Sequence, residues 1–522
     1  MRDFQSPSNA EIIQSGTGKI EQQAHADFGR KTVFWVFLLM CSALVFSAVV
    51  NLQLYADGSA YLFNIILYKG PSIWHGRLGN HLFHAPAVWF TRLSENLIAA
   101  KLIFCLTYAS IPFFSLLLSF WVLRRNRRLF IWPSLIILMA NLVNMSWVSE
   151  FCLVIQLFCP VFFAAVIDPK GLEFKTLLVL IGPLIYTLHP MVSLFFIFMG
   201  VILICCYKKD LYIIAISFIL IAISLIKSLY KIFNIESYER KFIDINKIIN
   251  YIFDSSYEMI LLLVIVLFIG IYYLVKCENI KNLSTKIYLI FFILFELIIL
   301  YFINFNIKYN LIVINIIFII LNIFFIYIGI RKIKSETAGP MTLCMVWLCV
   351  SAGLMLLSQY ANHGYNLKTG LILIVAQAVM VMALIDHRRI DSGTSELVGR
   401  SHLVVVMAVV FFLVIIGKSL IWAKAVSNLQ TALRNQTELC MEADSEAYRW
   451  LKEFPNGILK TWRIGRTSLL VQNEPPRKLL LKKRGLCKRS RLNNRIYFSK
   501  RNGREFTKVD RVFNLTGRLN TD

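Results

Sequence analysis

The chain has 522 residues, of which 57% are hydrophobic and 14% aromatic, and its mean hydropathy is +0.64. Soluble domains are usually about 45–50% apolar, so this composition excludes an ordinary soluble enzyme or binding domain. The formal net charge of +25 would suggest nucleic-acid binding in a soluble protein. Here the positive residues gather in short loops and after residue 422, so we expect membrane lipids, and no nucleic acid, as partners of this charge.

Apolar runs long enough to cross a membrane recur along the chain up to residue 422. A helix needs about 20 residues to cross ~30 Å of hydrocarbon, and its backbone groups must be bonded within their own segment. The pattern therefore predicts an all-α polytopic membrane protein with about 13 transmembrane helices. The expected spans lie near 32–51, 98–122, 129–145, 151–167, 175–188, 191–207, 211–227, 250–275, 287–303, 310–330, 341–358, 371–385 and 401–422. The fifth is short and contains Pro183, which favours a tilted, kinked or partly inserted segment.

The distribution of Lys and Arg predicts the orientation of the spans. The loops of one alternate set are rich in these residues: Arg30-Lys31, RRNRR at 124–128, Lys208-Lys209, RKIK at 331–334 and Arg388-Arg389. The other set is poor in them, although residues 228–249 depart from this pattern. We therefore expect a cytoplasmic tail over 1–31, a transmembrane domain over 32–422 whose loop 52–97 faces outward, and a basic outward-facing domain over 423–522. The expected location is the cytoplasmic (inner) membrane.

The segment after residue 422 has the features of a small extramembrane module. The stretches GILKTW, TSLLVQ and KLLLKK predict strands, and we expect an α+β fold. Its two cysteines, Cys440 and Cys487, could pair in an oxidising compartment. The positive charge of the segment opposes an outward position, but long domains are translocated largely regardless of charge.

Loop 52–97 concentrates ionisable side chains, and the first of them is Asp57. This residue follows the first span by about one helical turn and is expected at the outer interface. A carboxylate there can accept a proton from a hydroxyl, or bind a divalent cation that neutralises phosphate. An aspartate at a helix amino terminus is equally an ordinary cap.

Basic residues follow Asp57 in the same loop. Lys69 and Arg77 could hold a phosphate, the lysine as a point charge and the arginine through a bidentate fork. His75, His81 and His84 could act as bases or ligands. The alternative is that these histidines and the neighbouring aromatic residues anchor a re-entrant loop at the interface.

Other candidates are predicted at the same outer level of the membrane. Glu150 precedes a span and could be a second acid, or a solvated interfacial charge. His189 is followed by a proline, which opens a break in the chain where the imidazole could face a cavity; a structural turn is the alternative. His363 belongs to another predicted outer loop, and Glu296 lies inside an apolar run, where an acid is a functional suspect by default.

The stretch DGSAY at 57–61, the long first outer loop, the many spans, the turn at His189 and the outward carboxyl-terminal module resemble the GT-C superfamily of membrane glycosyltransferases. The resemblance implies that Asp57 is the catalytic base, with Glu150 and His189 as further catalytic candidates. It implies a lipid-phosphate-linked sugar donor and a glycan, lipid or protein acceptor in the cell envelope. The superfamily's D-x-D pattern is absent because position 59 is Ser, so no cofactor is predicted and a divalent cation stays open.

Three other kinds of membrane protein compete with this interpretation. A transporter or flippase would place paired charges near the middle of the bilayer on broken helices, and the sequence suggests little such charge apart from Glu296. A polysaccharide polymerase or ligase would carry a long outer loop in its second half. A scaffold without enzymatic activity would give no role to any polar residue of the outer loops.

Overall fold

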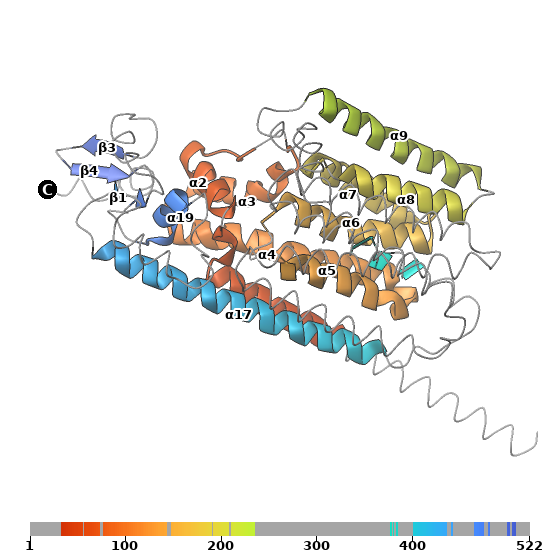
Figure 1. Ribbon diagram of the computed structural model, residues 1–522, viewed down its shortest axis with the longest axis horizontal. Coiled ribbons are helices and arrows are strands. Elements are labelled where there is room, and N and C mark those ends of the chain that lie inside the picture. Colours follow the sequence, from red (N-terminus) through yellow and green to blue (C-terminus); the bar gives the residue numbers. More distant parts are fainter. Residues whose placement is uncertain are drawn as a thin grey trace, which may run out of the picture.

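The structure is a computed structural model of the chain. It describes residues 33–55, 57–73, 77–143, 148–190, 192–207, 210–234, 376–377, 379–380, 383–384, 400–435, 440–441, 464–473, 479–480, 498–501 and 504–507. These residues are mostly helical (Figure 1). The predicted spans between 250 and 358, together with most of 371–385, lie outside the described residues.

The described helices fall where the apolar runs predict them. The first covers Val33–Val49 and is followed by a short 3-10 helix η1, Leu52–Leu54. The long loop forms α2, Asp57–Tyr68, and α3, Asn80–Leu93. The helices that follow are α4 (Leu97–Val122), η2 (Leu123–Arg125), η3 (Arg127–Phe130), α5 (Ile131–Val143), α6 (Glu150–Ile167), α7 (Leu172–Leu188), α8 (Val192–Cys206), α9 (Leu211–Phe233) and α17 (Arg400–Arg434).

Four helices in the described part of the chain are long and apolar enough to cross a membrane. They are α4, α6, the stretch Leu211–Tyr230 of α9 and the stretch Val404–Arg434 of α17. Val33–Val49 and Val192–Ile204 are shorter apolar helices. The run that contains Pro183 is a helix of 17 residues, α7, and the proline lies inside it.

Helix α6 forms the centre of the bundle. It contacts α4, α5, α7 and α8, and its residues from Glu150 to Val166 are all buried. Rings from neighbouring helices interlock there, with Phe158 centred 5.0 Å from Phe195. In contrast, α9 leaves large apolar side chains such as Phe218 and Ile226 exposed, at 60% and 64%. A buried central helix and an apolar outer face are what a helical bundle in lipid is expected to show.

Two ion pairs connect three loops at one end of the bundle. Arg124, after α4, lies 2.6 Å from Glu173 at the start of α7. Lys170, after α6, pairs with Asp210, the residue that caps α9. The predicted alternation of loops assigns all three of these connections to one side of the membrane. The opposite ends of α4 and α6 carry the long loop with α2 and α3.

The carboxyl-terminal segment lies beside α2 at that opposite end of the bundle (Figure 1). Helix α17 continues to Arg434, well beyond the predicted end of the last apolar run at 422. It is followed by α19, Ile464–Val471, by a parallel pair of β1 (Cys440–Met441) with β2 (Leu479–Leu480), and by an antiparallel pair of β3 (Phe498–Arg501) with β4 (Arg504–Thr507).

One of the strand predictions in this segment is wrong. The stretch TSLLVQ forms most of α19, whereas KLLLKK does contain the short strand β2. Five consecutive residues of α19, from Thr467 to Val471, are buried. A short apolar run does not distinguish a strand from a buried helix, and packing against neighbouring helices decided the outcome. Cys440 is disulfide-bonded, and position 487 lies outside the described residues.

Candidate functional site

The site is built around the first turn of α2. A Cβ atom added to Gly58 would lie 1.7 Å from the carbonyl oxygen of Gln53, so glycine is what allows α2 to begin directly against η1. Asp57 is the first residue of the helix and is half-buried. Asp57 therefore lies at the amino terminus of a helix, as the sequence allows. Because α2 starts there, the carboxylate and Tyr61, one turn later, share one face of the helix.

The carboxyl-terminal ends of α2 and α3 are joined by hydrogen bonds from side chains to backbone carbonyl oxygens. Lys69, just after α2, has a φ of 49°, in the left-handed region. Its ammonium donates a hydrogen bond to the carbonyl oxygen of Thr91, and Nε of Arg92 donates to the carbonyl oxygen of Lys69 at 2.8 Å. Lys69 was predicted to bind substrate, and in this structure its ammonium is occupied in holding the two short helices together.

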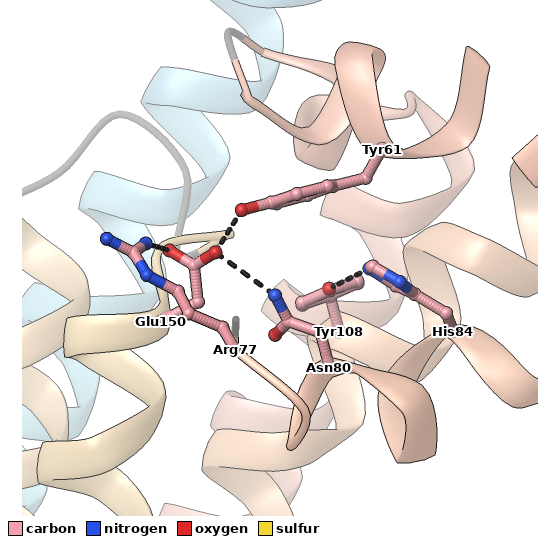
Figure 2. Close-up of polar contacts among 6 residues, drawn as sticks. All are labelled: Tyr61, Arg77, Asn80, His84, Tyr108 and Glu150. Atoms are coloured by element: carbon pink, nitrogen blue, oxygen red, sulfur yellow. Dashed lines mark hydrogen bonds and ion pairs between the residues drawn. The ribbon is translucent and has the colours of Figure 1, made fainter. Parts of the chain in front are cut away.

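Glu150 lies at the centre of a buried polar cluster (Figure 2). It is the first residue of α6 and is only 5% exposed. Arg77 approaches its Oε2 at 2.7 Å, while Tyr61 and Asn80 donate hydrogen bonds to Oε1, the latter at 3.1 Å. The solvated interfacial charge considered from the sequence is wrong, because this carboxylate is buried and held by three donors. Glu150 and Arg77, both predicted as site residues, contact each other directly.

Tyr61 lies one turn after Asp57 on α2 and donates its hydrogen bond to Glu150. Burial raises the pKa of the Tyr61 phenol well above its ordinary value of 10.0, and the negative charges of Glu150 and Asp57 raise it further. The phenol is therefore protonated at neutral pH and acts as a donor. The two acids influence the same hydroxyl group, which places both carboxylates in one electrostatic neighbourhood.

His84 lies one turn after Asn80 on α3, on the same face. Its Nε2 is 2.9 Å from the hydroxyl of Tyr108 on α4, and its ring is fully buried (Figure 2). Burial lowers the pKa of His84 from 6.5 to about 4, against the opposing effect of Glu150. The imidazole is thus neutral at pH 7 and could accept or donate one hydrogen bond on each nitrogen.

Two buried polar atoms of α3 have no hydrogen-bond partner among the described residues. They are Oδ1 of Asn80 and Nδ1 of His84. Buried polar atoms are nearly always paired with protein or with ordered water. Each of these two atoms, one helical turn apart on α3, could therefore bond to a polar group such as a hydroxyl or an ordered water.

His189 follows α7 and packs its ring against Phe151, with the centroids 5.4 Å apart. Its carbonyl oxygen accepts a hydrogen bond from Nζ of Lys227 at 3.2 Å, and Tyr186 accepts another from the same ammonium. These hydrogen bonds hold the turn after α7 against α9, as expected of a structural turn. The ring nevertheless lies next to the residue that follows Glu150.

The remaining predicted residues, His75 and His363, lie outside the described residues, as does Glu296. Sequence reasoning missed Tyr61, Asn80 and Tyr108, the partners of the predicted residues in Figure 2. Asn80 could have been identified from the sequence, because it precedes His84 by four residues and would share one face of a helix with it.

Two buried lysines inside apolar runs were also missed. Lys101 of α4 is 3% exposed and donates to Oδ1 of Asn473 at 2.7 Å. Lys418 of α17 is 6% exposed, and its Nζ lies 3.4 Å from the carbonyl oxygen of Asn141. A charged residue within an apolar run is a signal of a functional site. Sequence reasoning applied this signal to Glu296 and not to these two lysines.

Within the described part of the chain, no three His, Cys, Asp or Glu side chains are grouped so that they could hold a metal ion. A cation bound to a substrate phosphate needs only one or two protein carboxylates. Among the described residues of this site, the half-buried Asp57 could be such a ligand.

Comparison with known proteins gives no relative. No protein-family description matches this chain, and neither does any curated protein or any solved structure. The geometry of the described residues therefore stands alone as the guide to function.

Proposed function

We propose that the protein is a membrane glycosyltransferase that moves a sugar from a lipid-phosphate-linked donor to a cell-envelope acceptor at the membrane–water interface. The observation that supports this most is the grouping of Asp57, Arg77 and Glu150 at one end of the bundle, under two short helices of the first long loop. A lipid-linked donor cannot leave the bilayer, so its transferase needs polar groups at headgroup level.

The proposed reaction is a direct displacement. The acceptor hydroxyl oxygen attacks the anomeric carbon of the sugar, and the bond between that carbon and the phosphate oxygen breaks. The hydroxyl proton passes to Asp57, and the electron pair leaves with the lipid phosphate, whose charge a guanidinium or ammonium group stabilises. Arg77 is the group proposed for that role.

The two acids take different parts in this proposal. Glu150 already accepts hydrogen bonds from Arg77, Tyr61 and Asn80, and a carboxylate held by three donors is a poor base. Asp57 is half-buried at the start of a helix and suits proton acceptance better. We therefore assign Glu150 to orienting the guanidinium of Arg77, and we propose that the polar atoms of Asn80 and His84 bind a sugar or acceptor hydroxyl.

The proposed architecture is a polytopic protein with about 13 spans, an inward amino terminus and an outward α+β module. Each span predicted up to residue 227 coincides with a described helix, which supports this count. The disulfide at Cys440 supports an outward module, since disulfides persist mainly in oxidising compartments.

The test is mass spectrometry of cell-envelope glycans and lipid-linked sugars in cells with and without the protein. A transferase predicts that one lipid-linked sugar accumulates, and that its glycan product disappears, when the gene is deleted. Asp57→Asn should reproduce the deletion at normal expression and thermal stability. Asp168→Asn, at the other end of the bundle, is the matched control and should restore the product. Unchanged glycans and lipid-linked sugars in the deletion would refute the proposal.

A transporter or flippase remains the second candidate, and the buried ammonium of Lys418 favours it. Charged residues inside a membrane commonly mark transport pathways. Under this alternative, Lys418→Met would block movement of a lipid-linked sugar across vesicles while Asp57→Asn would not. The transferase predicts instead that, in a sugar-transfer assay, Asp57→Asn abolishes transfer and Lys418→Met does not.

A further inference from the structure

Helix α19, which belongs to the carboxyl-terminal segment, lies against α2 (Figure 1). The hydroxyl of Thr467 is 2.8 Å from that of Ser59, and both residues are almost fully buried. The guanidinium of Arg466 lies over the ring of Phe63, 5.6 Å from its centroid. A contact buried on both sides, between residues 408 positions apart in the sequence, indicates a specific docking site for this segment.

The residues of α2 that touch α19 lie on the face opposite the site. With 3.6 residues per turn, each residue turns the helix by about 100°. Ser59 and Phe63 are therefore within about 40° of each other, and Asp57 and Tyr61 are within about 40° of each other on nearly the opposite side. Helix α2 thus lies between α19 and the cluster around Glu150.

Two further contacts fix the end of the docked segment. Oδ1 of Asn473 accepts a hydrogen bond from the buried ammonium of Lys101 on α4 at 2.7 Å. The carbonyl oxygen of Val471 accepts one from the side chain of Gln430 on α17. The segment is consequently attached to the first loop and to two long helices of the bundle.

A helix as short as α2, with 12 residues, has little stability without packing. Its position depends on the elements around it, which are η1, α3 and α19. We propose that the segment Ile464–Asn473 is a positioning element of the site. By holding one face of α2, it keeps Tyr61 against Glu150 and fixes the position of Asp57 on the opposite face, with Thr467 as the central positioning residue.

The docking part of this inference is independent of the reaction, and the functional part rests on the proposed transferase activity. The first experiment therefore needs no substrate. Full-length protein carrying Ser59→Cys and Thr467→Cys is oxidised in native membranes and run on a non-reducing gel. A covalent loop of this size should change its mobility. Ser59→Cys with Thr431→Cys, an exposed position on α17, is the control and should stay uncrosslinked. Failure of the first pair to crosslink would overturn the docking.

The second experiment asks whether Thr467 acts on the site through α2. Apparent melting temperatures are measured for Thr467→Val, Tyr61→Phe and the double variant. Coupling through α2 predicts that the double variant loses clearly less than the sum of the two single losses. Thr431→Val combined with Tyr61→Phe is the control and should be additive. Additivity for Thr467 as well would mean a merely local structural role and would refute the proposal.

The third readout is transfer itself. Thr467→Val should lower kcat with little change in KM, and Thr467→Ser, which keeps the hydroxyl, should restore it. Equal kcat values for Thr467→Val and wild type would overturn the positioning role. If the wild-type protein transfers no sugar, the proposed function fails, while the crosslink and the melting temperatures still decide the docking.

Discussion

The neutral buried imidazole of His84 predicts how the stability of this protein depends on pH. The pKa of His84 falls from 6.5 to about 4 in the folded chain because the ring is buried. Between these values the unfolded chain binds a proton that the folded chain does not, so acid favours unfolding. The contribution is fully present above pH 6.5, is lost progressively as the pH falls, and is gone below pH 4.

The size of the effect follows from the difference of about 2.5 units. At 1.36 kcal/mol per unit, the whole contribution is about 3 kcal/mol, of which about 2 kcal/mol is lost by pH 5. The ring lies next to two aromatic side chains, Tyr61 at 5.1 Å and Phe104 at 6.4 Å between centroids. An imidazolium there would have little solvent around it.

The assay is denaturant titration of the detergent-solubilised protein at pH 7.5 and pH 5.0. His84→Gln keeps a polar partner for Tyr108 but cannot titrate in this range. Its free energy of unfolding should therefore fall by about 2 kcal/mol less than that of the wild type between the two pH values. His81→Gln, an exposed histidine on the same helix, is the control and should follow the wild type. Equal losses for His84→Gln and wild type would refute the reasoning.

Further predictions concern the carboxylate, the glycine and the disulfide. Glu150→Gln should lower the free energy of unfolding by about 3 kcal/mol because it leaves a largely buried guanidinium without its counter-charge. Glu173→Gln, which breaks a half-exposed ion pair, should lower it by less than about 1 kcal/mol. A similar loss for both variants would contradict the burial of the cluster. Gly58→Ala should cost at least about 2 kcal/mol, since its Cβ would collide with backbone, while Gly70→Ala, whose nearest neighbour would be 3.7 Å away, should be nearly neutral in the same titration. Peptide mapping without reductant should find Cys440 in a disulfide, and recovery of its free thiol would contradict the fold of the tail.

The helices of the first half could be predicted from the sequence because each is a long apolar run between polar loops. The start of α4 is a clear case, since Asn96 caps it by accepting the amide hydrogen of Ala99 at 3.0 Å. Such signals are local. A residue's neighbours along the chain are enough to determine them.

The contacts within the site could not be predicted in this way. Arg77 and Glu150 were each singled out as charged residues in polar turns, but nothing in the sequence indicates that they pair across 73 positions. Tyr61 looked like one more aromatic residue at the interface until the fold placed its hydroxyl against Glu150. Pairings of this kind depend on how helices pack, and a single sequence carries little information about that.

The prediction of a strand at TSLLVQ failed for a related reason. Its residues are equally suitable for a strand or a short helix, and long-range packing against α2 and α17 determined which one formed. Lys418 shows the opposite case. Its signal, a charge in an apolar run, was present in the sequence, and its partner on α5 could be found only in three dimensions.

The length of α17 determines where the carboxyl-terminal segment meets the bundle. Its 35 residues extend for about 52 Å, some 20 Å more than the hydrocarbon layer. The helix therefore sets the distance between its own start and the segment that packs against α2. Four extra residues in its last turns would raise the attachment point by about 6 Å and rotate it by about 40°, so that α19 would no longer meet α2 although every side chain of both helices is unchanged.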